Sequence, residues 1–302
     1  MKSTLKPQFM FPGVLHVSQI KNLPNQYSRK SCFIPILDQS SFENIPDAAF
    51  YTFFKTDVGS FSCNLQPGCV LINRPRNIIS ESTKNFTDSS LLIIHSSDQN
   101  LAFALNENCD PTVRSDMIQG LDRIVNEKVK LHDVVSPAIT FPVNSRNLGT
   151  WQGLYTISTN STISKYQIFS ASLNPTRTFK TTINTTRGSN KVSLPQNLTS
   201  SGVLYAITLH TSCSLALLSE SEAATRENEL SKTVPEKWND EFFEHTYEGP
   251  DDMPAHLKCA IQGAETSVAI QNGKIIGEEE FFLIEHRDHR SLRKVVFYLF
   301  EN

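Results

Sequence analysis

The feature that most constrains this fold is an order of predicted elements that occurs twice. Apolar and alternating runs predict strands at 51–61 and 89–97, then a helix from 111 to about 128, then strands on both sides of a turn at 149–153. After a Ser/Thr/Asn-rich stretch near 158–165, the order strand, strand, helix, strand and strand recurs. Such internal repetition is typical of a duplicated domain. At roughly 150 residues per domain, a chain of 302 residues accommodates two copies.

Local signals place the helices. Asp110 is a suitable N-cap and Pro111 a suitable first helical residue. DDMPAHLKCAIQ predicts a further helix with an acidic cap, Pro254 near its start and Gly263 as its stop. ESEAATRENELSK stands where the first helix stood, although its apolar face is poor.

The predicted class is α+β, with two tandem domains that each pack a mixed or antiparallel sheet against helices. We expect an N-terminal extension at 1–50, a shortened first domain at 51–163 and a second domain at 164–302.

Charge and composition exclude several classes of protein. The net charge of -3 and the pI of about 6.2 give no basic field for nucleic acid. No apolar run approaches the roughly 18 residues that a membrane span needs, and the N-terminal MKSTLKPQFMFPG lacks the apolar core of a signal peptide. The six cysteines form no C-x-x-C pair, which favours free thiols in a reducing compartment. We therefore expect a cytoplasmic protein that binds neither nucleic acid nor membrane.

Several long and unusual strings resemble one family. NENCDPTVRSDM (106–117) and GTWQG (149–153) stand in the first half, while HTS (210–212), YEGPDDMPAH (247–256) and EHR (285–287) stand in the second. With these strings the chain resembles the YjbQ family, also called secondary thiamine-phosphate synthases, from about residue 51 to its end. Family members are small single-domain α+β proteins that assemble as trimers. The resemblance implies two tandem YjbQ-like domains and leaves open whether the fused chain forms a homo-oligomer or closes on itself.

Each half lacks motifs that the other half keeps. The place of HTS in the first half falls on 98–100 without a gap, or on 95–97 with a three-residue insertion. The YEG-x-DDMP-x-H string is missing there, and EHR has become Ser-Thr-Asn at 158–160. In the second half NEN-x-DP has become 218–223, and GTWQG has become an acidic run near 276–281. We hypothesise that both halves contribute to one composite site.

The hypothesis brings together residues from distant strings. The first half would contribute Glu107, Asn108, Trp151 and Gln152, and the second half His210, His245, Asp252, His256 and Arg287. The resemblance and the side-chain types assign catalysis to His256, His210, Glu107 and Asp252. They assign substrate or cofactor binding to Arg287, Trp151, Gln152 and Asn108. They assign a divalent metal, Mg or Zn, to His210, His245, His256 and Asp251.

Each assignment has a physical reason and a structural alternative. Imidazoles among carboxylates suit a divalent metal, whereas an acidic pair before a helix is also an ordinary cap. The N-terminus of the helix near Met253 suits a phosphate and disfavours a cation at His256, whose imidazole should tend to be neutral. Arg287 suits bidentate binding of phosphate, or belongs to a solvated strand end. Trp151 is either a platform for a flat ligand or an aromatic plug of a sheet.

For function, the resemblance implies a weak thiamine-phosphate synthase. This transferase joins a pyrimidine-methyl diphosphate to a thiazole phosphate and releases pyrophosphate. The same residue types suit metal-assisted hydrolysis of a phosphate ester, so the partner would be a small phosphorylated substrate. The alternative is a degenerate, non-catalytic protein for ligand binding or interaction, which the lost motifs favour.

Overall fold

The structure, a computed structural model, describes residues 58–72 and 88–301. Within these ranges the chain forms antiparallel sheets and a small number of helices, which agrees with the predicted α+β class. The expected extension at 1–50 and the expected start of the first domain at residue 51 lie outside the described residues. No helix in the described part is both long and apolar enough to cross a bilayer.

The strands fall into a first and a second half. The first half holds β1 (Val58–Leu65), β2 (Gly68–Ile72), β3 (Leu91–Ser96), β4 (Leu101–Glu107), β5 (Ala138–Pro142), β6 (Gln152–Ser158) and β7 (Ser164–Leu173). The second half holds β8 (Arg177–Thr185), β9 (Gly188–Lys191), β10 (Gly202–Thr208), β11 (Cys213–Leu218), β12 (Glu265–Gln271), β13 (Lys274–Ile275), β14 (Glu280–Glu285) and β15 (Ser291–Glu301). The helices are α5 (Pro111–Ile124), α6 (Glu220–Thr233), α7 (Trp238–Glu241) and α8 (Asp252–Gln262), with 3-10 turns at Leu131–Asp133 and Ser145–Asn147.

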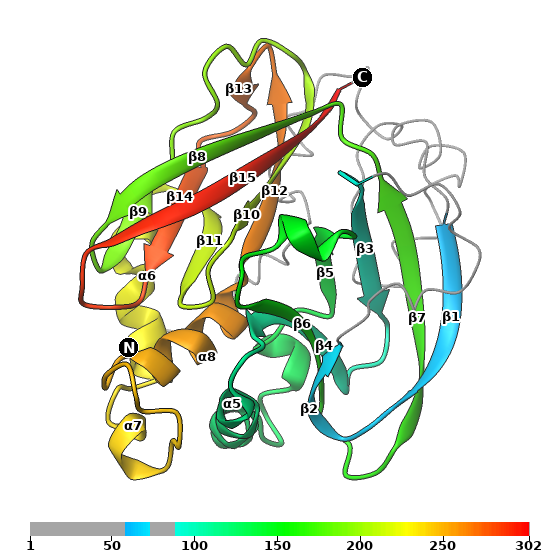
Figure 1. Cartoon of the computed structure of the whole chain (residues 1–302), viewed down its shortest axis with the longest axis vertical. Coiled ribbons are helices and arrows are strands. Elements are labelled where there is room, and N and C mark those ends of the chain that lie inside the picture. The colour runs from blue at the N-terminus through cyan, green and yellow to red at the C-terminus, as the bar shows by residue number, and fades with distance from the viewer. Residues whose placement is uncertain (1–57, 73–87, 302) are drawn as a thin grey trace.

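The sheets of the two halves have the same order of strands. The first half forms the sheets β1-β7-β3-β5 and β2-β6-β4. The second half forms β8-β15-β10-β12, to which the short β13 adds an edge, and β9-β14-β11. Figure 1 shows the larger sheets spread to either side, with α5, α7 and α8 gathered at one end of the molecule. Strand for strand, each sheet of one half therefore has a counterpart in the other.

Strand β7 belongs with the first half by its hydrogen bonds. The sequence pattern predicts that this segment begins the second domain, at residue 164. It pairs instead with β1 and β3, in ladders such as Val58↔Ala171 and Leu91↔Leu173. The sequence pattern identified the strand correctly but could not identify its partners, because pairing is a tertiary property.

Strand register gives residue-level equivalences. Gly68 pairs with Ser158 in the first half, and Gly188 pairs with Glu285 in the second. Residues 158–160 therefore occupy the places of 285–287, as the sequence alignment supposed. The loops 97–100 and 209–212 are equally long, which favours the alignment without a gap, where Asp98 stands in the place of His210.

The helix ends follow from caps. The Asp110 carboxylate accepts from Thr112 N at 2.8 Å and begins α5. The helix ends at Ile124 rather than near 128. Asn126 forms a turn there, because its side-chain Oδ1 accepts a hydrogen bond from Lys128 N at 2.9 Å. Helix α8 ends at Gly263, whose φ of 97° favours glycine.

The helix α8 packs against both halves. Its buried Met253 and Leu257 share a core with Met117 and Leu121 of α5. The contact with α5 is close, because a Cβ at Gly120 would lie 2.4 Å from Leu257 Cδ2. A second continuous core joins the large sheets of the two halves. The position of α8 is therefore set by first-half and second-half residues together.

Candidate functional site

The site begins with His256, which is buried on α8. Its Nδ1 lies 3.0 Å from Asn106 Oδ1 and 3.1 Å from the carbonyl oxygen of Thr211. Asn106 Nδ2 in turn donates to the His256 carbonyl at 2.8 Å, which fixes the orientation of the amide. Because both neighbours of Nδ1 are acceptors, Nδ1 carries the proton and Nε2 presents its lone pair.

That lone pair faces carboxylate oxygens from both halves. His256 Nε2 lies 3.3 Å from Glu107 Oε2 and 3.6 Å from Asp252 Oδ1. Burial lowers the pKa of His256, although Asp252 and Glu107 act to raise it. An acceptor nitrogen among acceptor oxygens is favourable only with a proton or a cation among them. Glu107 and His256 were assigned to the composite site, and the structure brings them together.

His245 links the halves through a charged bridge. Its Nδ1 lies 2.8 Å from Asp110 Oδ2 and its Nε2 lies 2.9 Å from Asp252 Oδ2. Burial opposes its charge, but hydrogen bonds to Asp252 and Asp110 raise the pKa of His245 to about 9. The Asp116 carboxylate accepts from His245 N at 2.8 Å. His245 is therefore an imidazolium with both ring nitrogens engaged.

Arg287 lies against the start of α8. Its Nη1 donates to Asp252 Oδ1 and lies 3.3 Å from Glu248 Oε2, while Nη2 donates to the Glu248 carbonyl at 2.6 Å. Its Nε is 3.0 Å from Asp251 Oδ1, an ion-pair distance without hydrogen-bond alignment. The Glu248 side chain is 72% exposed, so it approaches Arg287 from the solvent side, whereas Asp252 and Asp251 hold Arg287 from the protein interior.

The donor atoms suit a divalent cation. Ligating atoms of Glu107, His245 and His256 all lie within 4.8 Å of one another. Nitrogen and carboxylate donors are those of zinc and related metals. Glu107 and His256 offer donor atoms directly, and Asp252 adjoins them, whereas His245 would first have to lose a proton and a carboxylate partner. The residues therefore fit a cation held mainly by Glu107 and His256.

Two residues expected among the metal ligands face elsewhere. The His210 ring accepts from Lys294 N at 2.9 Å, and burial with the nearby Arg293 lowers the pKa of His210 to about 4. The Asp251 carboxylate faces Arg287 and accepts from Asp288 N at 2.7 Å. Asp251 holds the N-cap position of α8 as expected but makes no side-chain cap bond, because that carboxylate is already engaged.

Gln152 connects the two halves, and Asn108 holds the Gln152 backbone within the first half. Gln152 Nε2 donates to the carbonyl oxygens of Thr208 and His210, at 2.8 and 3.0 Å. Asn108 Nδ2 donates to the Gln152 carbonyl at 2.9 Å. Trp151, whose backbone accepts from Asn108 N, is 59% exposed, so its ring does not close a core.

Three polar residues of this region escaped sequence reasoning. Asn106 and Asp116 are fully buried, and Asp110, read only as a cap, also binds His245. An available signal was an acid on the apolar stripe of a helix, since Asp116 lies next to Met117 and three residues after Val113. Glu227 carries the same signal on α6, where its buried neighbours are Ala223 and Leu230.

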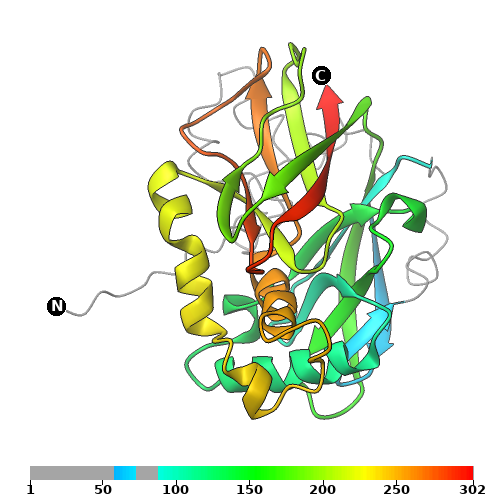
Figure 2. The same cartoon turned by 60° about the vertical axis from the view of Figure 1, so that its left-hand side comes forward.

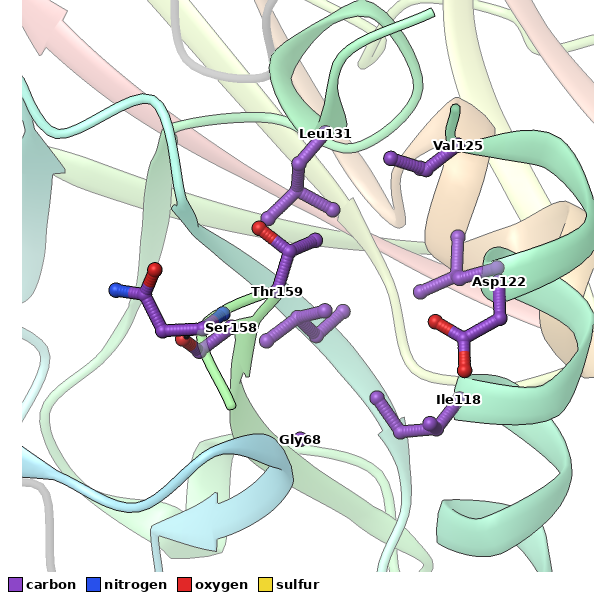
Figure 3. A pocket seen from close by; sticks show the side chains of 10 residues that line it. Gly68, Ile118, Asp122, Val125, Leu131, Ser158 and Thr159 are labelled. Atoms are coloured by element: carbon purple, nitrogen blue, oxygen red, sulfur yellow. Dashed lines mark hydrogen bonds between the residues drawn. The ribbon is translucent and has the colours of Figure 1, made fainter. Parts of the chain in front are cut away.

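A cavity of about 170 Å³ lies in the first half, away from the donor cluster. Figure 3 shows Ile118, Asp122 and Val125 of α5 on one side and Ser158 and Thr159 on the other. By register the cavity adjoins the place that the EHR string occupies in the second half.

Comparison with known proteins identifies one family. A family model described as "UPF0047 protein YjbQ-like" matches residues 170–302. The UPF0047 protein YjbQ of Salmonella typhimurium is 36% identical over 100 residues, which are 32% of this chain and 70% of that protein. The protein of the same name from Escherichia coli O157:H7 is 35% identical, with the same coverage.

Solved structures give weaker similarity. A YbjQ-like protein of unknown function from Sulfolobus solfataricus is 14% identical with a TM-score of 0.33, covering 40% of this chain and 95% of that one. A hypothetical protein from Aeropyrum pernix is 21% identical with a TM-score of 0.31, covering 41% and 99%.

Proposed function

This chain belongs to the YjbQ (UPF0047) family, and we propose that it is a cation-dependent enzyme that acts on a small phosphorylated substrate at one composite site. The observation that carries the proposal is the 3.3 Å approach of Glu107, from the first half, to His256 Nε2, from the second. We also infer that the halves are tandem copies of the family domain, which their matching strand orders support. We propose a cytoplasmic location, because the cysteine spacing favours free thiols in a reducing compartment.

The residues divide the work by chemistry. Glu107 and His256 would hold a divalent cation such as Mg or Zn, beside Asp252. When bound, such a cation neutralises charge that develops on a leaving diphosphate. Arg287 would bind a phosphate group in exchange for the Glu248 carboxylate, close to the N-terminus of α8. Asn106 would keep the proton on His256 Nδ1, so that Nε2 stays a donor atom.

The specific reaction that we propose is thiamine-phosphate synthesis at a low rate. In this transfer the ring nitrogen of a thiazole phosphate forms a C–N bond to the methylene of a pyrimidine-methyl diphosphate. The C–O bond to the diphosphate breaks, and pyrophosphate leaves with the electron pair. No external oxidant or reductant is needed. Arg287 then stabilises the charge on the departing group.

The test is turnover by the purified chain. The pyrimidine diphosphate and thiazole phosphate are supplied with Mg²⁺ or Zn²⁺, and thiamine phosphate is quantified for wild type, His256→Ala and, as a control, His95→Ala. We expect formation that depends on the metal and is lost only in His256→Ala. Release of phosphate from a simple ester without coupling would indicate hydrolysis instead, and turnover that survives in His256→Ala would refute the site.

The second candidate is a non-catalytic binding protein. It is favoured by His245, whose ring nitrogens are both engaged by carboxylates, and by His210, whose ring faces Lys294. This candidate predicts binding of a phosphorylated ligand without turnover under any metal.

A further inference from the structure

A buried polar cluster lies behind Arg287. The Ser214 hydroxyl is 2.6 Å from His286 Nε2, and His286 Nδ1 is 2.5 Å from Glu227 Oε2. Lys258 Nζ donates to the other oxygen of Glu227 at 3.0 Å and to Ser231 Oγ at 2.9 Å. Arg187 Nη2 also donates to that oxygen, at 3.3 Å. Glu227 is therefore an acceptor shared by the strand end, through His286, by α8, through Lys258, and by Arg187.

The order Ser214, His286, Glu227 is that of a nucleophilic triad, but its burial excludes this role. Ser214 and His286 are both 0% exposed, so no substrate atom reaches the hydroxyl. The acceptors decide the tautomer: His286 Nδ1 donates to Glu227, and Nε2 accepts from Ser214. A cluster of this kind can act only through the groups that it holds in place.

The groups on either side of the cluster belong to the candidate site. His286 directly precedes Arg287, the proposed phosphate ligand, at the end of β14. Lys258 lies on α8, half a turn after His256. Figure 2 shows α6, which carries Glu227, running beside α8. The Glu227 carboxylate thus joins the element that holds the cation to the segment that holds the anion.

The first half shows that the fold does not require this cluster. Relative to the preceding strand, α6 begins three residues earlier than α5, so the helices are compared from their N-caps Asp110 and Ser219. On that count Ile118 stands in the place of Glu227. By strand register Thr159 stands in the place of His286. Both residues line the cavity of about 170 Å³. The same architecture thus folds there without the cluster, around a cavity at the surface where Thr159 is exposed. No Arg287 counterpart needs support there, because residue 160 is asparagine.

We propose that Glu227 is a positioning residue that sets the separation of Arg287 from the cation ligands on α8. The inference rests on the proposed function, since it assigns a role to Glu227 in binding the phosphorylated substrate. Removing the carboxylate together with its Lys258 partner leaves Arg187 paired with Glu236 and Asp288, so no buried charge loses all its partners, and the fold should survive while the link between α8 and residue 286 is lost. Binding of the anion should then weaken without loss of the cation.

The experiment measures two affinities by calorimetry: Mn²⁺ alone, and inorganic pyrophosphate added to the Mn²⁺-loaded protein. For the double variant Glu227→Gln/Lys258→Met we expect Mn²⁺ affinity within about twofold of wild type and pyrophosphate affinity about tenfold weaker. In an Arg287→Ala background the double variant should cause no further loss. The matched control is Glu229→Gln, on the exposed face of the same helix, which should change neither affinity.

Ser214→Ala supplies a second variant, which removes only the hydrogen bond to His286 Nε2 and should weaken pyrophosphate severalfold in the same Arg287-dependent way. Equal losses of Mn²⁺ and pyrophosphate, or additive losses with Arg287→Ala, would overturn the positioning role. A wild-type protein that binds both probes with variants that change nothing would overturn this inference alone. A wild-type protein that binds neither would overturn the proposed function as well.

Discussion

In the first half Ile118 and Thr159 line a cavity, while at the same positions of the second half Glu227 and His286 form a buried polar cluster. The halves differ again after their first helices. The first half makes a 3-10 turn at Leu131–Asp133, where the second half makes α7 and α8. The two halves thus share one order of strands but differ in the side chains at equivalent positions and in the helices that follow. The second half therefore supplies the helix that carries His256, and the first half supplies Asn106, which orients its ring.

The largest effect is expected on the free energy of unfolding, when Glu227 of the buried polar cluster is changed and compared with Ile118 at the equivalent position of the first half. Glu227→Ala leaves Lys258, whose side chain is 1% exposed, without its carboxylate. A buried charge that loses its partner costs about 3–5 kcal/mol, so the free energy of unfolding in urea should fall by that amount. The first-half change Ile118→Val should cost less than about 1.5 kcal/mol. Similar costs at both positions would show that the two sites are energetically alike.

A second test replaces Asn106 of the first half with leucine, the residue at the equivalent position of the second half. Counted from Leu101↔Ser158 and Cys213↔Glu285, Asn106 and Leu218 are equivalent. Asn106→Leu removes both hydrogen bonds to His256, so the free energy of unfolding should fall by about 1–3 kcal/mol and metal affinity about tenfold. Denaturation and calorimetry measure these changes, with the exposed Asn100→Leu as control. Unchanged metal affinity would mean that Asn106 does not orient the imidazole.

The contact between the halves at Glu265 predicts a pH dependence. Its Oε1 accepts from Thr140 N at 3.1 Å, its Oε2 has no hydrogen-bond partner among the residues that the structure describes, and burial raises the pKa of Glu265 well above the usual 4.5. The folded state keeps a proton that the unfolded state releases, so this group's contribution to stability is lost as pH rises above about 4.5.

Glu265→Gln keeps a neutral acceptor there and should flatten this pH dependence, raising the unfolding free energy at pH 8 more than at pH 4. The comparison is sharp because the first-half equivalent is Ala138, by the pairs His95↔Ala138 and Ile207↔Glu265. Melting curves across this pH range measure the effect. An unchanged slope would show that Glu265 is ionised in the folded protein.

The smallest effect is expected at the proposed anion site around Arg287, a position that asparagine occupies in the first half. Glu248→Gln removes a carboxylate that competes for Arg287, so pyrophosphate should bind about two- to fivefold more tightly. Calorimetry compares this variant with Glu244→Gln, another exposed acid of the same loop. Weaker binding would mean that Glu248 contacts the ligand or orders the loop.

Sequence reasoning predicted local structure well, and long-range partners less well. Caps and turn residues placed α5 and α8, because those signals lie within a few residues of each helix end. The motif strings point to Glu107 and His256, and the structure brings these two side chains into contact. The direction in which the His210 ring points could not be predicted, because it is set by a hydrogen bond from the backbone of Lys294, which lies far away in the sequence on β15. Glu227 escaped for a similar reason: its partners come from α8 and from the end of β14.

We propose that one cation site per chain is built jointly by Glu107 of the first half and His256 of the second. Titration of the metal-free chain with Zn²⁺, read as ions bound per chain, tests it most directly. We predict one tight site in wild type, its loss in Glu107→Gln and in His256→Ala, and no further loss in the double variant. Two tight sites per chain, or one that persists in both single variants, would contradict the account.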